Sequence, residues 1–128
     1  MIPSILRQAG LSNALKAGSV SDEFIDWFLA VVSDTDTIRN ELTTNPPIIT
    51  PIRGLNPDVA LTDELLGALE TPVKFVWGTN DLFGGENTAR QLTASLPNAE
   101  LDLMPGAGHA PWIDDPDHAA ASARSFLQ

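Results

Sequence analysis

Asp81 and His109 are the two residues whose types and positions could do catalytic chemistry together. Asp81 stands four residues past Trp77, after the apolar run TPVKFVW, and His109 stands five residues past Met104, after ELDLM. A carboxylate that accepts a hydrogen bond from the Nδ1–H of an imidazole fixes the ring tautomer, and it leaves Nε2 free to act as a general base. The two residues are therefore a candidate acid–base pair.

The loop that carries His109 is rich in glycine. In the stretch MPGAGHAPWIDDPD, residues 104–117, Gly106 and Gly108 come directly before the histidine. Glycine permits backbone turns that a side chain forbids, so we expect this loop to present the His109 ring. Each residue alone also fits a structural role, because an aspartate after a strand commonly binds the amides of its own turn.

The segments around these two residues alternate between strand and helix patterns. Residues 73–77 and 100–104 are short apolar runs typical of buried strands, and 86–97 and 116–128 have the pattern of helices, the last with Asp115 as its cap and Pro116 in its first turn. This order predicts two parallel strands joined by a right-handed crossover. The carboxyl ends of parallel strands meet at one edge of a sheet, which would bring Asp81 close to His109.

The first seventy residues differ in pattern. Ser21 precedes a run with apolar residues at helical spacing, Phe24 to Val32, and a second, shorter helix is expected around Ile38 and Leu42. A proline-rich connector follows over 45–58, in which IITPI is the only strand candidate. The last helix of this half should begin after Thr62 and bury one leucine side, made of Leu65, Leu66 and Leu69.

Residues 71–128 resemble the C-terminal end of the α/β-hydrolase fold, in the order TPVKFVWG, GTNDLFGG, ENTARQLTASLPNAE, ELDLM, PGAGH and the helix after DDPD. The resemblance implies a partial α/β fold with two parallel C-terminal strands and flanking helices, plus a mostly helical cap segment and connector over residues 1–70. It makes Asp81 the acid and His109 the base of a catalytic triad. The substrate would be a small molecule with an ester, amide, epoxide or similar bond, and neither a cofactor nor a metal is expected.

Four aromatic residues are candidates for substrate binding. Phe83 and Trp112 follow the acid and the histidine in the chain, whereas Trp27 and Phe28 belong to the expected cap. Cap undersides commonly line apolar pockets, although each of these residues would also fit simple packing.

The departure from this family is the nucleophile. The 128 residues contain neither a G-x-S-x-G elbow nor its aspartate version, and the oxyanion hole that accompanies it is missing too. We therefore expect a C-terminal fragment or split chain, inactive alone, whose partner is the missing N-terminal hydrolase half or a second copy. The alternative is a non-catalytic interaction module that completes its sheet by oligomerisation or with a partner chain.

Charge and composition restrict the partners further. The formal net charge of −10, from 17 acidic and 7 basic residues, argues against binding to nucleic acid or to an anionic membrane surface. No cysteine is present, which excludes disulfides and thiolate chemistry. The longest apolar stretch, FIDWFLAVV, contains Asp26 and is too short to span a bilayer. With no signal-peptide pattern at the start, the expected location is cytoplasmic.

Overall fold

The computed structural model describes residues 6–7, 10–37, 39, 49–50, 54–55 and 61–128. The chain divides into two compact units, one made of Met1–Val20 with Glu64–Gln128 and the other of Ser21–Asp63. The expected assignment of residues 1–70 to a cap region stays a prediction. The first unit contains both candidate catalytic residues.

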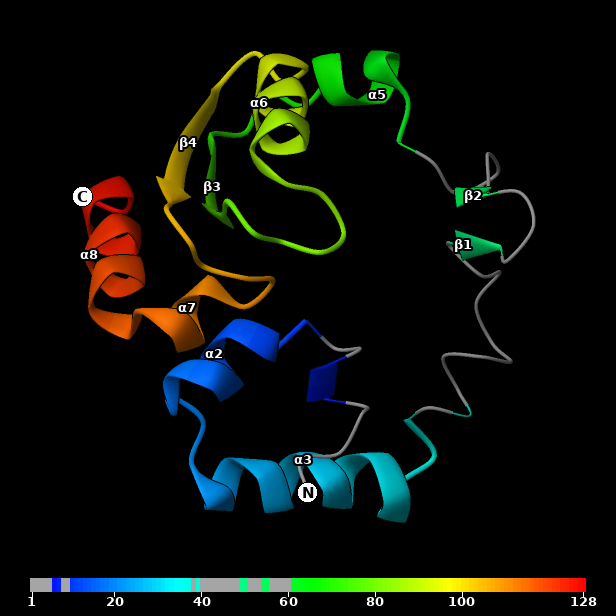
Figure 1. Ribbon diagram of the computed structural model, residues 1–128. Coiled ribbons are helices and arrows are strands. Elements are labelled where there is room, and N and C mark those ends of the chain that lie inside the picture. The colour runs from blue at the N-terminus through cyan, green and yellow to red at the C-terminus, as the bar shows by residue number, and fades with distance from the viewer. Residues whose placement is uncertain (1–5, 8–9, 38, 40–48, 51–53, 56–60) are drawn as a thin grey trace. The chain divides into compact units, whose positions relative to one another are not determined.

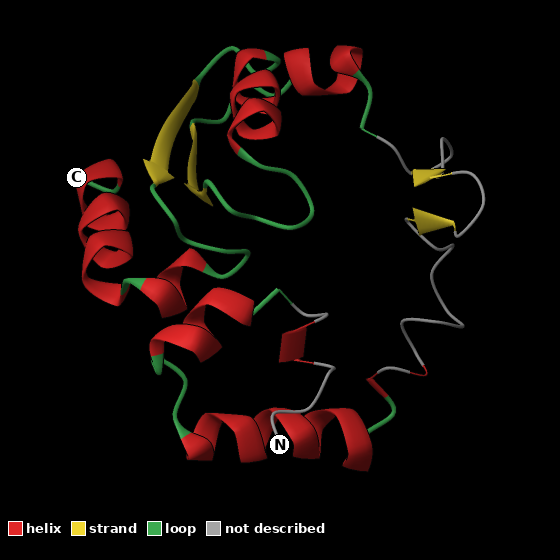
Figure 2. Ribbon diagram, in the orientation of Figure 1, coloured by secondary structure: helices red, strands yellow, loops and turns green. Residues whose placement is uncertain are grey.

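A two-stranded parallel sheet forms the centre of the first unit (Figure 1). Strand β3, Val73–Gly78, pairs with β4, Ala99–Met104, in a register that sets Val73 beside Ala99 and Gly78 beside Met104. Helix α6, Glu86–Ala94, connects the two strands. The predicted strand–helix–strand crossover is thus confirmed. The carboxyl ends of both strands lie at the same end of the sheet, and the loops that follow the strands start there (Figure 2).

The face of the sheet toward helix α8, Pro116–Phe126, carries two charged side chains. Lys74 and Asp102 are on this face, because Lys74 Nζ contacts Ser125 at 3.4 Å and Asp102 contacts His118, both on α8.

Residues of β3 are half-buried up to Gly78, not fully buried as the sequence suggested. The reason is that β4 is the only strand paired with β3 in the described part of the chain, so one edge of β3 stays uncovered.

The closing helix begins as its sequence predicts. The carboxylate of Asp115 accepts a hydrogen bond from the backbone N–H of His118 at 3.0 Å, and Pro116 occupies the first turn. A short helix that the sequence analysis did not include, α7, Pro111–Asp114, precedes it. Together α7 and α8 connect the loop of His109 to the face of the sheet that α8 covers.

Helix α5, Asp63–Gly67, begins after Thr62, as predicted, but its leucine side chains are not buried as predicted. Leu65 and Leu69 are exposed and Leu66 is half-buried, so the expected buried leucine side is wrong for the described structure. An apolar stripe at helical spacing shows which side would pack, but only the surrounding fold provides a surface for it.

Helix α2, Ser12–Ala17, belongs to the same compact unit as the sheet and packs against α7. Leu6, Leu11 and Ala14 are buried there. The remaining buried apolar side chains of this unit come from α6, β4 and the loop after β4: Ala89, Leu96, Met104, Ala107 and Ala110. The N-terminal segment thus contributes to the core that carries the candidate site.

The second unit contains helix α3, Asp22–Asp34, and a short antiparallel pair, β1 (Ile49–Thr50) with β2 (Gly54–Leu55). The Ser21 hydroxyl accepts a hydrogen bond from the N–H of Phe24 at 3.1 Å, which confirms the predicted helix start. Two residues of IITPI form β1, while the helix expected around Ile38 and Leu42 lies outside the described residues. Across the part of the chain that the structure describes, none of the helices has the length and apolar character needed to cross a membrane.

Candidate active site

Asp81 and His109 are in direct contact at the carboxyl ends of the two parallel strands. Oδ2 of Asp81 lies 2.9 Å from Nδ1 of His109, although the two residues are 28 positions apart in the sequence. The predicted proximity is therefore confirmed. The Asp81 side chain is 7% exposed and that of His109 is 45% exposed, so the carboxylate is shielded while the ring reaches solvent. An Nδ1–H tautomer donates this hydrogen bond and leaves Nε2 as the ring atom that can accept a proton.

The two oxygens of Asp81 have different partners. Oδ1 accepts a hydrogen bond from the backbone N–H of Phe83 at 2.8 Å, and Oδ2 faces His109. The structural role in the turn and the pairing with the imidazole, which the sequence left as alternatives, therefore coexist. Fixing one oxygen to the turn also orients the other oxygen toward the ring.

The loops of the acid and of the histidine are joined by several hydrogen bonds around Gly106. The N–H of Gly106 donates to the Thr79 hydroxyl at 2.8 Å, and its carbonyl accepts from the Asn80 side chain at 3.3 Å. The backbone N–H of Asn80 donates to the Ala107 carbonyl at 2.9 Å. Gly106 has φ +78°, a conformation that disfavours other residues. The glycine-rich loop is thus shaped to bind the neighbouring acid loop.

Asp114 supports the same loop from the other end. Its carboxylate accepts a hydrogen bond from the N–H of Gly108 at 2.6 Å, next to His109. The sequence analysis did not single out Asp114. Its only signal there was an aspartate close behind the histidine loop, which is too common to be informative.

One aromatic ring packs against the imidazole, and a second lines the same groove. The rings of Phe83 and His109 meet edge to face with centroids 4.6 Å apart. Trp112 lines a groove of about 270 Å³ together with both members of the acid–base pair. Phe83 and Trp112 are exposed themselves, so they present apolar surface beside His109. The other residues that line the groove are Lys74, Phe75, Val76, Trp77, Gly78 and Pro111.

This groove follows the edge of β3. Five consecutive residues of the strand, 74–78, line it. Side chains alternate between the two faces of a strand, so a groove on one face would be lined by every second residue. The groove therefore lies along the uncovered edge of the strand, and His109 is among the residues that line it.

Trp27 and Phe28, the two other candidates for substrate binding, lie on α3 in the second unit. Each packs near Phe24, with ring centroids 5.6 Å apart for Trp27 and 6.3 Å for Phe28. Their contribution to the pocket at His109 stays a prediction.

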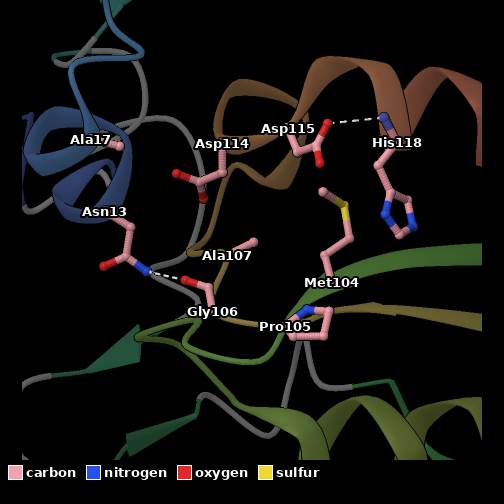
Figure 3. A pocket seen from close by; sticks show the side chains of 9 residues that line it. All are labelled: Asn13, Ala17, Met104, Pro105, Gly106, Ala107, Asp114, Asp115 and His118. Carbon is pink, nitrogen blue, oxygen red and sulfur yellow. Dashed lines mark hydrogen bonds between the residues drawn. The ribbon is translucent and has the colours of Figure 1, made fainter.

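A larger pocket, of about 380 Å³, is lined by the loop that follows β4 and by residues of α2, α7 and α8 (Figure 3). Neither Asp81 nor His109 lines it, so it is separate from the candidate site. Its walls are made by Asn13, Ala17, Met104, Pro105, Gly106, Ala107, Asp114, Asp115 and His118. Among the described residues, no three His, Cys, Asp or Glu side chains are grouped to hold a metal ion.

His118, in the first turn of α8, forms a second histidine–aspartate pair. Its Nε2 lies 3.1 Å from both carboxylate oxygens of Asp102 on β4. Burial raises the pKa of Asp102, but the Ser122 hydroxyl, His118 and the charge of Lys74 lower it by more, and the pKa lies below its ordinary value of 3.8. The pair connects α8 to the sheet and is a structural contact outside the groove. Its sequence signal was the aspartate within the apolar strand ELDLM.

The chain is similar to parts of several known proteins. The chain is 31% identical over 96 residues to the 1-acylglycerol-3-phosphate O-acyltransferase ICT1 of Saccharomyces cerevisiae, a match that covers 73% of this chain and 21% of that protein. It is 36% identical over 56 residues to the putative hydrolase LipZ of Mycobacterium tuberculosis, which covers 44% of this chain and 19% of LipZ. The chain therefore spans about a fifth of the length of these relatives. No family model matches it.

A solved structure has the same fold. MGS-MChE2, an α/β hydrolase enzyme from a sediment metagenome of the Mar Chica lagoon in Morocco, superposes with a TM-score of 0.55 at 23% identity, over 83% of this chain and 44% of that protein. The described part of the chain thus has a partial α/β-hydrolase fold.

Proposed function

We propose that this chain supplies the acid and the general base of an α/β-hydrolase that cleaves an ester, amide, epoxide or similar bond in a small molecule. The observation that carries the proposal is the 2.9 Å contact between Asp81 Oδ2 and His109 Nδ1 at the ends of neighbouring parallel strands. In this role Nε2 of His109 removes a proton from the attacking group, and the Asp81 carboxylate stabilises the imidazolium that results.

The apolar surface beside the imidazole fits the proposed substrate class. The Phe83 ring packs edge to face against the His109 ring, and Trp112, three residues after His109, is exposed. These side chains would hold an apolar part of the substrate, with Trp27 and Phe28 of the cap as further contacts.

The attacking atom must come from outside the 128 residues, since they contain no nucleophile elbow. The proposed partner is the remaining part of a hydrolase core, since a second copy of this chain would lack the same nucleophile. Support comes from the uncovered edge of β3, where unpaired backbone N–H and C=O groups can accept a further strand. His109 also lines the groove along this edge, so a strand bound there would lie next to the base.

A chimera tests the catalytic role. The segment of MGS-MChE2 that superposes on this chain is replaced by residues 1–128, and hydrolysis of p-nitrophenyl acetate is measured. We expect activity in the chimera and its loss, by about 10³-fold or more, on His109→Ala and on Asp81→Ala. His118→Ala is the matched control, because it removes the other histidine of the chain, which contacts Asp102 away from the groove.

Equal rates for the folded chimera and its His109→Ala variant would contradict the proposed role of the base. So would a loss of activity in His118→Ala as large as that in His109→Ala, because the effect would then report the fold and not the site.

A second candidate function is a non-catalytic interaction module. It is favoured by the sheet of the first unit, which has two strands in the described part of the chain, whereas parallel sheets are usually larger and buried on both faces. The native mass of the purified chain separates the two proposals. A folded, monodisperse homo-oligomer favours the module, and a monomer that binds a hydrolase core favours the catalytic role.

A further inference from the structure

We propose that the N-terminal segment Gly10–Asn13 positions His109 for its contact with Asp81, and that Gly10 and Asn13 are positioning residues for the general base. The inference deepens the proposed function, since it rests on His109 being that base. The segment is far from the histidine in the sequence but belongs to the same compact unit.

Gly10 lies directly against His109. Its φ is +84°, and a Cβ added there would come within 2.3 Å of the His109 Cβ and 3.0 Å of the ring Cγ. No side chain fits at that distance, so the backbone of Gly10 packs directly against the His109 side chain. A Cβ added to Gly108 would lie 3.1 Å from the Gly10 carbonyl oxygen. The segment therefore also lies close to the backbone of the histidine loop at Gly108.

Asn13 fixes the loop from the same segment. Its side-chain amide donates a hydrogen bond to the Gly106 carbonyl at 2.7 Å, across 93 positions of sequence (Figure 3). The same carbonyl accepts from the side chain of Asn80, the residue before Asp81. One carbonyl oxygen therefore connects the N-terminal segment, the histidine loop and the acid loop.

The segment is itself anchored, as a support must be. Leu6, Leu11 and Ala14 are buried, and the N–H groups of Gly10 and Leu11 donate to the carbonyls of Arg7 and Leu6, each at 3.1 Å. Motion of this segment would have to expose apolar core side chains. It therefore provides a fixed surface against which the His109 loop closes.

The test is NMR of the full 128-residue chain labelled with ¹⁵N-histidine. The chain has two histidines, so His118, bound to Asp102, is an internal reference for every variant. The readouts are the Nδ1–H proton signal of His109 and its ring ¹⁵N shifts, which report the tautomer and the hydrogen bond to Asp81. A merely structural substitution elsewhere leaves them unchanged.

Gly18→Ala is the matched control for Gly10→Ala. Gly18 has a similar left-handed φ of +71°, but no atom lies within 4 Å of an added Cβ. Both variants thus carry the same backbone strain, and only Gly10→Ala collides with His109. We expect Gly18→Ala to keep the wild-type His109 signals and Gly10→Ala to lose the Nδ1–H signal, with His118 unchanged in both.

Asn13→Ala decides the proposal by itself if Gly10→Ala prevents folding. It should make the His109 Nδ1–H exchange with water about tenfold faster or more, whereas Lys16→Ala, an exposed change on the same helix, should not. Wild-type His109 signals and exchange in Asn13→Ala would overturn the inference. These readouts do not depend on turnover, so an inactive chimera with intact His109 signals contradicts the proposed function and leaves the positioning role in place.

Discussion

The indole N–H of Trp77 donates a hydrogen bond to the carbonyl oxygen of Gly84 at 2.7 Å. Trp77 lies near the end of β3, and Gly84 lies at the far end of the loop that contains Asp81. The backbone N–H of Gly84 in turn donates to the Asp81 carbonyl at 3.4 Å. A side chain of the strand therefore closes the loop that leaves it, and this closure limits how far the Asp81 carboxylate can move from His109.

Replacing Trp77 by phenylalanine should loosen this loop. The Trp77→Phe change removes the N–H donor while keeping a large apolar ring, so the Gly84 carbonyl loses a partner at a cost of about 1 kcal/mol in the free energy of unfolding. We expect faster hydrogen exchange at the amides of Phe83 and Gly84, measured by NMR. Trp112→Phe is the control: that side chain is 59% exposed, and its replacement should change stability by less than about 0.5 kcal/mol. Unchanged exchange in Trp77→Phe would show that the loop is held by other contacts.

The isolated 128-residue chain should hydrolyse p-nitrophenyl acetate without a burst of nitrophenolate. An acid and a base without an attacking residue have no acyl-enzyme route. His109→Ala should show the same slow rate as the wild type, which would then be ordinary imidazole or surface chemistry. A rapid burst that disappears in His109→Ala would reveal a nucleophile within these residues and contradict the prediction.

Asp102 should make the first unit sensitive to acid. Its pKa in the folded chain lies below the ordinary value of 3.8, so the carboxylate stabilises the fold above that pH, and this contribution is lost as the pH falls through the folded value. Asp102→Asn should therefore flatten the loss of stability between about pH 4 and pH 2, measured by urea unfolding. Asp26→Asn removes an exposed carboxylate of the other unit, and we expect it to keep the wild-type slope. The same slope in Asp102→Asn would contradict the assigned role.

The parts of the site that the sequence predicted depend on short-range patterns. Both strands, their connecting helix and the cap at Asp115 follow from local composition, and parallel pairing then fixes which ends meet. For this reason Asp81 and His109 could be assigned together before their contact was known. The glycines before the histidine gave a further local signal, since the turn at Gly106 requires that residue.

The supporting residues could not be predicted in this way. Gly10 and Asn13 contact the histidine loop across nearly the whole chain, and nothing in their own neighbourhood indicates a partner. The pairing of His118 with Asp102 depends on which face of the sheet α8 covers. The predicted burial of the α5 leucines was wrong for the same reason, because an apolar stripe does not indicate which surface will cover it.

Leu6 should be the residue whose truncation costs this unit the most, although it lies far from β3 and β4 in the sequence. It is 0% exposed, and its carbonyl accepts the N–H of Leu11, so it anchors the segment that lies against His109. Leu6→Ala should lower the free energy of unfolding by about 2–5 kcal/mol, because it removes buried methyl groups and leaves a cavity. Leu127→Ala, at a side chain that is 81% exposed, should cost less than about 0.5 kcal/mol in the same urea titration. Because the anchored segment lies against His109, Leu6→Ala should also weaken the His109 Nδ1–H signal, which Leu127→Ala should leave intact. A Leu6→Ala chain as stable as Leu127→Ala would mean that the N-terminal segment is not part of the core.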